Sequence, residues 1–273
     1  MEQIEEAAVS GPRPGELVFE DDFDDGSGGG LDRVRWLPHY LPQWSSRAAT
    51  AATWEVRDSC LHLTVAPDQA MWCPDVQDDP PLRVSGVQSG VFSGPVGSRV
   101  GQQPVDGRSV VREEQEAWWG WTPYLGRLEV RARMSLSPRS MAAWWFVGLE
   151  DSPERCGELC VMEVFGRSVS GTSAEIGMGV HAFRDPALSE DWAAPRLELD
   201  VSEFHVYAVD WRRGSADFLV DGVVVRSADV APDYPVQSML AVFDFPTWAT
   251  PADEQEAAHV PELVVDWVRG YAP

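Results

Sequence analysis

The sequence predicts an all-β fold in which two antiparallel sheets pack as a β-sandwich of the jelly-roll type. Three observations support this class: short runs of alternating apolar and polar residues recur along the chain, Gly, Pro and Asp residues separate them, and no amphipathic helix of useful length interrupts them. Many short strands joined by turns are typical of sandwiches and barrels.

The expected elements follow in chain order. The first strand, at residues 17–19, runs through an acidic segment into the glycine-rich loop 26–30. Residues 93–117 lack alternation, so we expect a long loop that borders the functional face. Asp221-Gly222 between two apolar runs is a strong hairpin signal. The further strands are predicted at residues 53–56, 60–65, 126–134, 141–148, 158–165, 175–183, 203–210, 216–225, 236–243 and 262–271.

Length and charge limit the classes of protein and partner. The 273 residues fit a flexible tail at 1–15 followed by a single sandwich domain at 16–273, which we expect to be a monomer. A net charge of -23 disfavours nucleic acid and anionic membranes as partners, because both attract clustered basic side chains. No stretch approaches a membrane span.

The first ten residues are acidic and lack the apolar segment of a secretory signal. We therefore expect either a cytosolic protein or an exported one whose signal has been removed, and the location stays open.

Tryptophan and cysteine usage gives two further indications. Thirteen tryptophans exceed what a core of this size needs, and indole rings are common platforms for sugars, although each ring could instead pack the core. Four unevenly spaced cysteines are too few for a disulfide scaffold. Cys60 and Cys73 could close a short loop, whereas Cys156 and Cys160, about 13 Å apart along a strand, should not pair.

The segment 157–163, GELCVME, carries the strongest functional signal. In a regular strand Glu158 and Cys160 would share one face and Glu163 would point into the apolar layer. A β-bulge near Val161-Met162 would return Glu163 to the face of Glu158 and leave Leu159, Val161 and Val164 for the core. The sequence therefore predicts a bulged strand with both glutamates on one face.

Two carboxyl groups on one face permit glycoside hydrolysis. Retaining glycosidases place them about 5 to 5.5 Å apart, so that one attacks the anomeric carbon and the other protonates the leaving oxygen. The alternative is that Glu158 and Glu163 are exposed acids on a solvated sheet face.

These residues resemble the hallmark of glycoside hydrolase family 16, which reads Glu-x-Asp-x-x-Glu and is usually preceded by Gly. The resemblance spans most of the chain and implies the laminarinase-like, concanavalin A-like jelly roll. Five further segments match the family in order: 17–23, 125–131, 143–148, 203–211 and 264–269.

The resemblance implies a role for each site residue. Glu158 would be the nucleophile and Glu163 the general acid and base, and Trp145 would stack on the sugar beside the scissile bond with His181 and Arg131 nearby. Burial and the charge of Glu158 should raise the pKa of Glu163 toward ~6. Outer sugar subsites are expected from the three tryptophans after the long loop, Trp118, Trp119 and Trp121.

Cys160 departs from the family pattern, because it stands where relatives have an Asp that orients the nucleophile. A thiol donates weakly and is normally uncharged at pH 7. We expect a retaining endo-acting hydrolase of β-1,3 or mixed-linkage β-glucan that this change can impair; the alternative is a catalytically silent glycan-binding protein. A cysteine enzyme using Cys160 with His181 is disfavoured, because the flanking glutamates favour the unreactive thiol.

The resemblance requires no cofactor and implies at most one structural calcium. Its ligands would be Asp266 with the backbone carbonyls around Asp22 and Ser59, in line with calcium's preference for oxygen. The alternative is that Asp266 is a surface acid without a metal. No zinc-type spacing of Cys and His occurs in the sequence.

Overall fold

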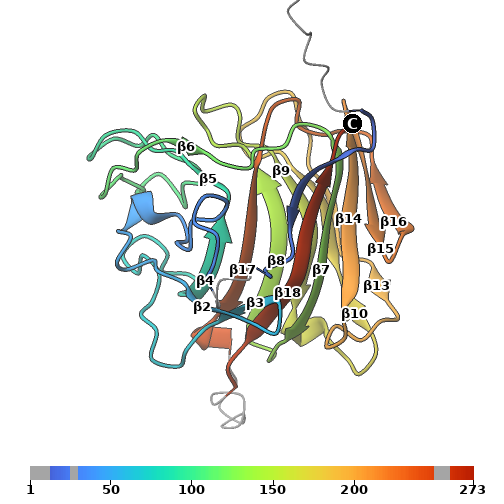
Figure 1. Cartoon of the computed structure of the whole chain (residues 1–273). Helices are drawn as coiled ribbons and strands as arrows, with labels where there is room; N and C mark the ends of the chain where they lie inside the picture. Colours follow the sequence, from blue (N-terminus) through green and yellow to red (C-terminus); the bar gives the residue numbers. More distant parts are fainter. Residues whose placement is uncertain (1–12, 25–29, 249–258) are drawn as a thin grey trace, which may run out of the picture.

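The computed structural model describes residues 13–24, 30–248 and 259–273 and confirms the all-β class (Figure 1). Across these residues every strand pair is antiparallel. The helical segments among them are three single 3-10 turns, η1 (Pro42–Trp44), η2 (Gly166–Ser168) and η3 (Pro246–Trp248). No helix in the described ranges is long and apolar enough to cross a membrane.

Two large sheets form the sandwich. An eight-stranded sheet runs in the order β16-β15-β14-β7-β18-β3-β2, with β1 also paired to β18. Its strands are β1 (Leu17–Asp21), β2 (Thr53–Arg57), β3 (Cys60–Thr64), β7 (Gly126–Ser135), β14 (His205–Arg212), β15 (Ser215–Val220), β16 (Val223–Ala228) and β18 (Glu262–Tyr271). A six-stranded sheet runs in the order β12-β11-β9-β8-β17-β4. Its strands are β4 (Arg83–Gln88), β8 (Ser140–Val147), β9 (Glu158–Phe165), β11 (Gly177–His181), β12 (Asp191–Ala193) and β17 (Gln237–Asp244).

Two short pairs complete the described strands, β5 (Gly90–Val91) with β6 (Trp118–Trp119) and β10 (Ala174–Glu175) with β13 (Arg196–Leu197). The loop predicted at residues 93–117 therefore connects β5 to β6. The predicted hairpin is confirmed: Asp221 and Gly222, with φ of 49° and 77°, join β15 to β16, as a type I′ turn requires.

The core lies between the two sheets because the strands alternate. On β7 every second residue is buried, including Leu128 and Val130. They pack with Trp144 and Phe146 of β8 and with the apolar side of β9 in one continuous cluster. The six-stranded sheet thus buries one face in the sandwich and turns the other, the site face, away from the eight-stranded sheet.

A second apolar cluster covers part of the site face. Trp145 of β8 and Phe243 of β17 pack there against side chains from the connections around η1 and from the 72–82 and 93–117 loops, including Leu41, Trp44 and Val111. These segments gather beside β4 in Figure 1 (blue to green). Loops therefore cover the site face above β17 and β8. On the neighbouring β9 the same face has the polar side chains of Glu158 and Glu163.

The four cysteines are all free thiols. Most of the tail predicted at residues 1–15 lies outside the described residues, but Gly15 N–H donates to the carbonyl of Ala272 at 2.9 Å. The single-domain boundary at residue 16 stays a prediction.

Candidate active site

Strand β9 contains the predicted bulge. Against β8, Met162 pairs with Trp144 and Cys160 with Trp145, so Val161 has no partner of its own. Against β11 the register shifts in the same place. As a result Glu158, Cys160 and Glu163 all line one pocket, whereas the residues between them join the core.

The pocket encloses about 230 Å³. Its walls come from β8, β9 and β17 and from loop residues that close over them. Glu163 also lines a second pocket of about 370 Å³, together with Phe165, Arg167 and Trp192. Glu163 therefore lines two hollows at once.

Glu158 receives its described hydrogen bond from the long loop. Gln103 Nε2 donates to Glu158 Oε2 at 3.1 Å, and Gln103 N–H donates to Glu150 Oε1 at 2.6 Å. Arg184 in turn holds the Glu150 carboxylate in an ion pair. Nothing in the sequence singled out Gln103 beyond its place in a loop expected to border the functional face.

Burial raises the pKa of Glu158 well above its usual value, and the carboxyl groups of Glu163 and Glu190 add to the rise. Within the described chain no Arg or His forms an ion pair with Glu158. Burial also raises the pKa of Glu163, although His181 and the Cys160 thiol lower it in part. The pKa of Glu163 is therefore raised, as expected, but by burial alone. The charge repulsion between the two carboxyl groups raises the pKa of Glu158 instead.

Cys160 lies between the two glutamates. Its thiol donates to Glu163 Oε2 at 3.6 Å and to the Gly177 carbonyl at 3.7 Å. Burial, followed by the Glu163 and Glu158 carboxyls, raises the pKa of this thiol well above its usual value. Cys160 is therefore an uncharged thiol in the free protein, which disfavours it as a nucleophile.

His181 of β11 lies directly opposite Glu158 of β9. The Nδ1 atom of His181 is 2.5 Å from Glu190 Oε1, and its ring stacks on Trp192 with 5.8 Å between centroids. Glu190 and Trp192 are site residues that the sequence did not reveal. Trp192 lines the second pocket, and its indole packs over Gly177 of β11, where a Cβ would lie 2.6 Å from the ring.

Trp145 lines the pocket but is only 5% exposed. Tyr40 and Phe243 contact its ring edge-on and at a tilt, with centroids 6.4 Å and 6.3 Å away. A sugar could reach Trp145 only through the pocket, because loops cover its other sides.

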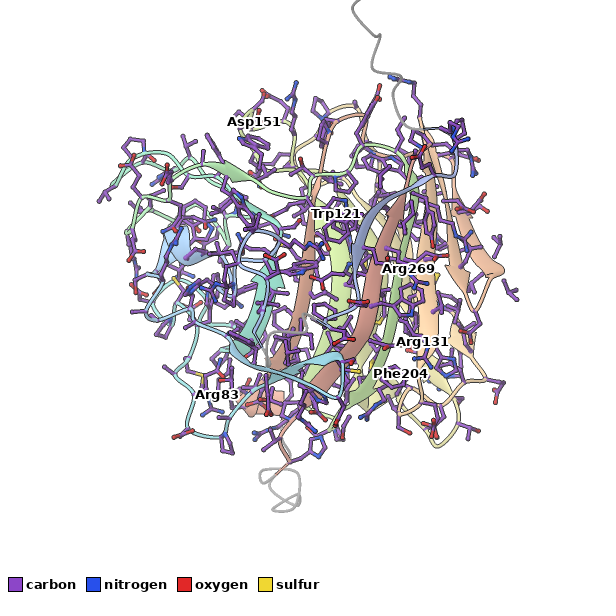
Figure 2. All side chains as sticks on the ribbon, in the orientation of Figure 1. Arg83, Trp121, Arg131, Asp151, Phe204 and Arg269 are labelled. Carbon is purple, nitrogen blue, oxygen red and sulfur yellow. The ribbon has the colours of Figure 1, made fainter. Side chains whose placement is uncertain are left out.

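The structure separates the three tryptophans at which outer subsites are expected, and those subsites stay a prediction. Trp121 lies in the connection after β6, where its ring stacks on Phe19 with 3.9 Å between centroids and packs against the core (Figure 2). Trp119 is 46% exposed but lines neither pocket at Glu163, and Trp118 lines a separate hollow beside Arg33 and Glu116.

The expected position of Arg131 near Trp145 is wrong. It lies on β7 of the eight-stranded sheet, where its guanidinium pairs with Asp266 and sits 4.5 Å from the Phe204 ring (Figure 2). Strand alternation points it outward from that sheet, away from the pocket on the six-stranded sheet.

The residues expected to hold calcium fit that ion poorly. The Asp266 carboxylate already forms an ion pair with the Arg131 guanidinium, whose positive charge disfavours a bound cation. Asp22 is exposed, and its carboxylate accepts the Asp24 N–H at 3.2 Å. Ser59 occupies a left-handed turn position with φ of 54°. The calcium site stays a prediction, and the ion pair counts against it.

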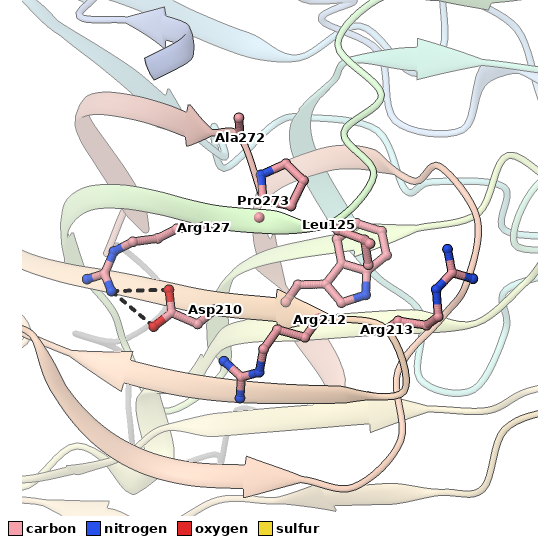
Figure 3. A pocket seen from close by; sticks show the side chains of 9 residues that line it. Leu125, Arg127, Asp210, Arg212, Arg213, Ala272 and Pro273 are labelled. Carbon is pink, nitrogen blue, oxygen red and sulfur yellow. Dashed lines mark hydrogen bonds and ion pairs between the residues drawn. The ribbon is translucent and has the colours of Figure 1, made fainter. Parts of the chain in front are cut away.

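A further pocket of about 340 Å³ lies at the end of the eight-stranded sheet near Pro273 (Figure 3). Its three arginines are all ion-paired: Arg127 with Asp210, Arg212 with Asp217, and Arg213 with Asp233. It contains no pair of acids, so it lacks the chemistry of the pocket on β9.

Solved structures share this fold. A GlcNAcα1-4Gal-releasing endo-β-galactosidase from Clostridium perfringens aligns with a TM-score of 0.77 and 24% identity over 97% of this chain, which spans 64% of that protein. A laminarinase catalytic domain from Thermotoga petrophila aligns at 0.62 and 16% over 94% of this chain and 97% of its own. An endo-β-1,3-glucanase from Pyrococcus furiosus aligns at 0.60 and 15% over 94% of each chain.

A comparison with curated proteins finds no match. The family model described as glycosyl hydrolases family 16 matches residues 124–269, more than half of the chain, and this range contains the bulged strand and both glutamates. The chain belongs to glycosyl hydrolases family 16.

Proposed function

We propose that the protein is a retaining, endo-acting β-glycosidase. The observation that carries the proposal is the bulge in β9, which sets Glu158 and Glu163 on one face with Trp145 beside them. Both carboxyls line the same pocket, and burial raises the pKa of each, so each can hold a proton more readily than an exposed glutamate.

In the proposed reaction Glu158, as the carboxylate, attacks the anomeric carbon while Glu163 protonates the leaving oxygen. The bond to the leaving sugar breaks and a covalent glycosyl-enzyme forms on Glu158. Glu163, now ionised, then takes a proton from water, which attacks the same carbon and releases Glu158. Two inversions give a product with the β configuration of the substrate.

The two hollows that Glu163 lines support cleavage inside a chain rather than at its end. A glycan laid across β9 would place one sugar in the Trp145 pocket and the next beside Trp192 and Phe165. The leaving oxygen between these two sugars would then lie at the Glu163 carboxyl, where the acid is needed.

For the substrate we propose a β-1,3 or mixed-linkage glucan, because the two glucanase structures of similar fold are named as enzymes of β-1,3-glucan. A β-galactoside-containing glycan is the second candidate, because the fold superposes on the clostridial endo-β-galactosidase with a TM-score of 0.77. One scaffold carries several linkages in this way, so the assay must include both classes.

Incubation with laminarin, lichenan and a β-galactan panel, agarose and carrageenan included, is expected to release new reducing ends from one class. Proton NMR of the first products should show the β anomer before mutarotation. An α anomer would overturn the retaining mechanism. If no glycan is cleaved but calorimetry detects oligosaccharide binding that survives Glu158→Gln and needs Trp145, the silent glycan-binding alternative replaces the proposal.

Gln103 is expected to act as a positioning residue for Glu158. Its amide supplies the hydrogen bond that the Glu158 carboxylate accepts. Replacing it with methionine, similar in size but unable to donate, should lower kcat about 10- to 100-fold, since a hydrogen bond to a charged group contributes about 1.5 to 3 kcal/mol. KM and the thermal unfolding midpoint should change little.

Gln77→Met is the matched control for this test, because Gln77 donates to the Pro80 carbonyl in a loop and does not line the pocket. A Gln103→Met enzyme with unchanged kcat would show that the amide does not orient Glu158.

A further inference from the structure

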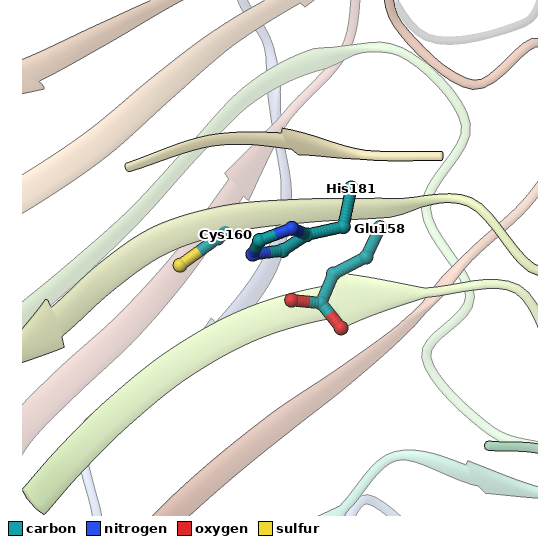
Figure 4. Close-up of side chains that lie close together, drawn as sticks. All are labelled: Glu158, Cys160 and His181. Carbon is teal, nitrogen blue, oxygen red and sulfur yellow. The ribbon is translucent and has the colours of Figure 1, made fainter. Parts of the chain in front are cut away.

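Three side chains with different metal-binding chemistry meet beside the pocket. One ligand atom from each of Glu158, Cys160 and His181 lies within 4.8 Å of the other two (Figure 4). The first two come from β9, and His181 comes from the neighbouring β11, paired directly with Glu158. Among the described ranges of the chain, this is the one group of three such side chains so close together.

The orientation of His181 suits a metal ligand. Its Nδ1 is held by Glu190 Oε1 at 2.5 Å, which leaves Nε2 as the free ring nitrogen. A metal-binding histidine usually donates its other ring N–H to a carboxylate, which fixes the ring and makes the metal-binding nitrogen more basic. Glu190 also accepts the Ala182 N–H at 3.1 Å, so the pair is anchored to the backbone.

The donor set selects the kind of ion. Thiolate, imidazole and carboxylate together favour zinc and related borderline ions over calcium or magnesium, which prefer oxygen alone. Bonds of about 2.3 Å to sulfur and about 2.0 to 2.1 Å to nitrogen and oxygen set tetrahedral ligand atoms about 3.3 to 3.7 Å apart. The 4.8 Å limit on the present separations is about 1 Å longer than this spacing.

Charge also favours a cation here. No arginine lines the pocket, and the chain has no lysine. Glu163 lies 3.6 Å from the Cys160 sulfur, and Glu190 stands behind His181. Each carboxyl stabilises a nearby dication.

We infer that Glu158, Cys160 and His181 form a binding site for zinc or a similar thiophilic divalent cation. Binding displaces the Cys160 proton to solvent, so the thiolate becomes a ligand and no electron is transferred. Three protein ligands leave the fourth position to water. The bound ion would occupy the Glu158 carboxylate and so would inhibit hydrolysis reversibly. This consequence rests on the proposed function, in which Glu158 is the nucleophile.

Cobalt(II) gives a test that needs no glycosidase activity, because it takes the same ligands and a cobalt-thiolate bond adds an absorption band in the near ultraviolet. Titration of the intact protein should produce this band at one equivalent, and zinc should remove it. Calorimetry with zinc should show one site. Cys160→Ser should abolish the band, and Glu190→Gln should weaken zinc binding about 10- to 100-fold.

Cys156→Ser is the matched control, since Cys156 is buried and free but lies outside the cluster. It should keep the band, as should Glu163→Gln, which would stop hydrolysis without removing a ligand. Circular dichroism would establish that each variant is folded. A missing band in the unaltered protein, or zinc affinity unchanged in Cys160→Ser, overturns the site. If zinc binds and no glycan is cleaved, only the proposed function fails.

Discussion

Replacing Glu158 with alanine is expected to lower kcat by about 10⁴-fold or more, the scale seen when a covalent nucleophile is removed from other hydrolases. Replacing Glu163 with alanine removes the proton donor and should cost about 10² to 10⁴-fold. The two variants should differ in the products that they form as well as in the fall in kcat, because the two carboxyl groups act on opposite faces of the sugar.

Azide distinguishes the two roles. In Glu158→Ala it can attack in place of the carboxylate and should yield the α-glycosyl azide. In Glu163→Ala it attacks the covalent intermediate and should yield the β-glycosyl azide. Both products can be identified by NMR, and exchanged configurations would mean that the roles of the two glutamates are reversed.

Glu129→Ala provides the control for these variants. Glu129 is ion-paired with Arg127 on the eight-stranded sheet, so its loss should leave kcat unchanged.

The Glu158→Gln variant should unfold at a higher temperature than the unaltered protein. Burial disfavours the charged carboxyl of Glu158 in the folded state, and the neutral amide removes that penalty.

Cys160→Asp is expected to raise kcat about 10- to 100-fold, the size of effect that a partner of a reacting group often has. The Cys160 thiol donates to Glu163 and Gly177 rather than to Glu158. A protonated aspartic acid in its place could donate a strong hydrogen bond to the Glu158 carboxylate and lower its pKa. The nucleophile would then be ionised in a larger share of the molecules.

Cys160→Ser is the matched control for this gain, because it keeps the size of the side chain without supplying a carboxyl group. Steady-state kinetics on the best substrate would compare the three proteins. Equal rates in Cys160→Asp and the unaltered protein would show that the thiol is not what limits turnover.

The strands and the bulge followed from the sequence because they depend on local pattern. The last strand, Glu262–Tyr271, has the bounds that alternation predicted. The bulge followed because Glu163 would otherwise be buried among apolar side chains, and only an extra residue restores its face. Strand β4 was missed, since Gly86 breaks its apolar pattern; that glycine allows close contact with Ala241 of β17.

The tertiary structure decided which distant residues join the site. Trp145 and Trp121 look alike in sequence, yet one lines the pocket and the other packs in the sandwich. Arg131 was expected near Trp145 but lies in the other sheet, because alternation tells which residues share a face but not which sheet a strand joins.

The sequence by itself determined the sandwich class, the bulged strand and the pair of acids, since each depends on residues that lie close together along the chain. Only the tertiary structure brought Gln103, Glu190 and Trp192 to those acids. Such contacts depend on how loops close over a sheet, and that depends on packing between segments far apart in sequence rather than on any local repeat.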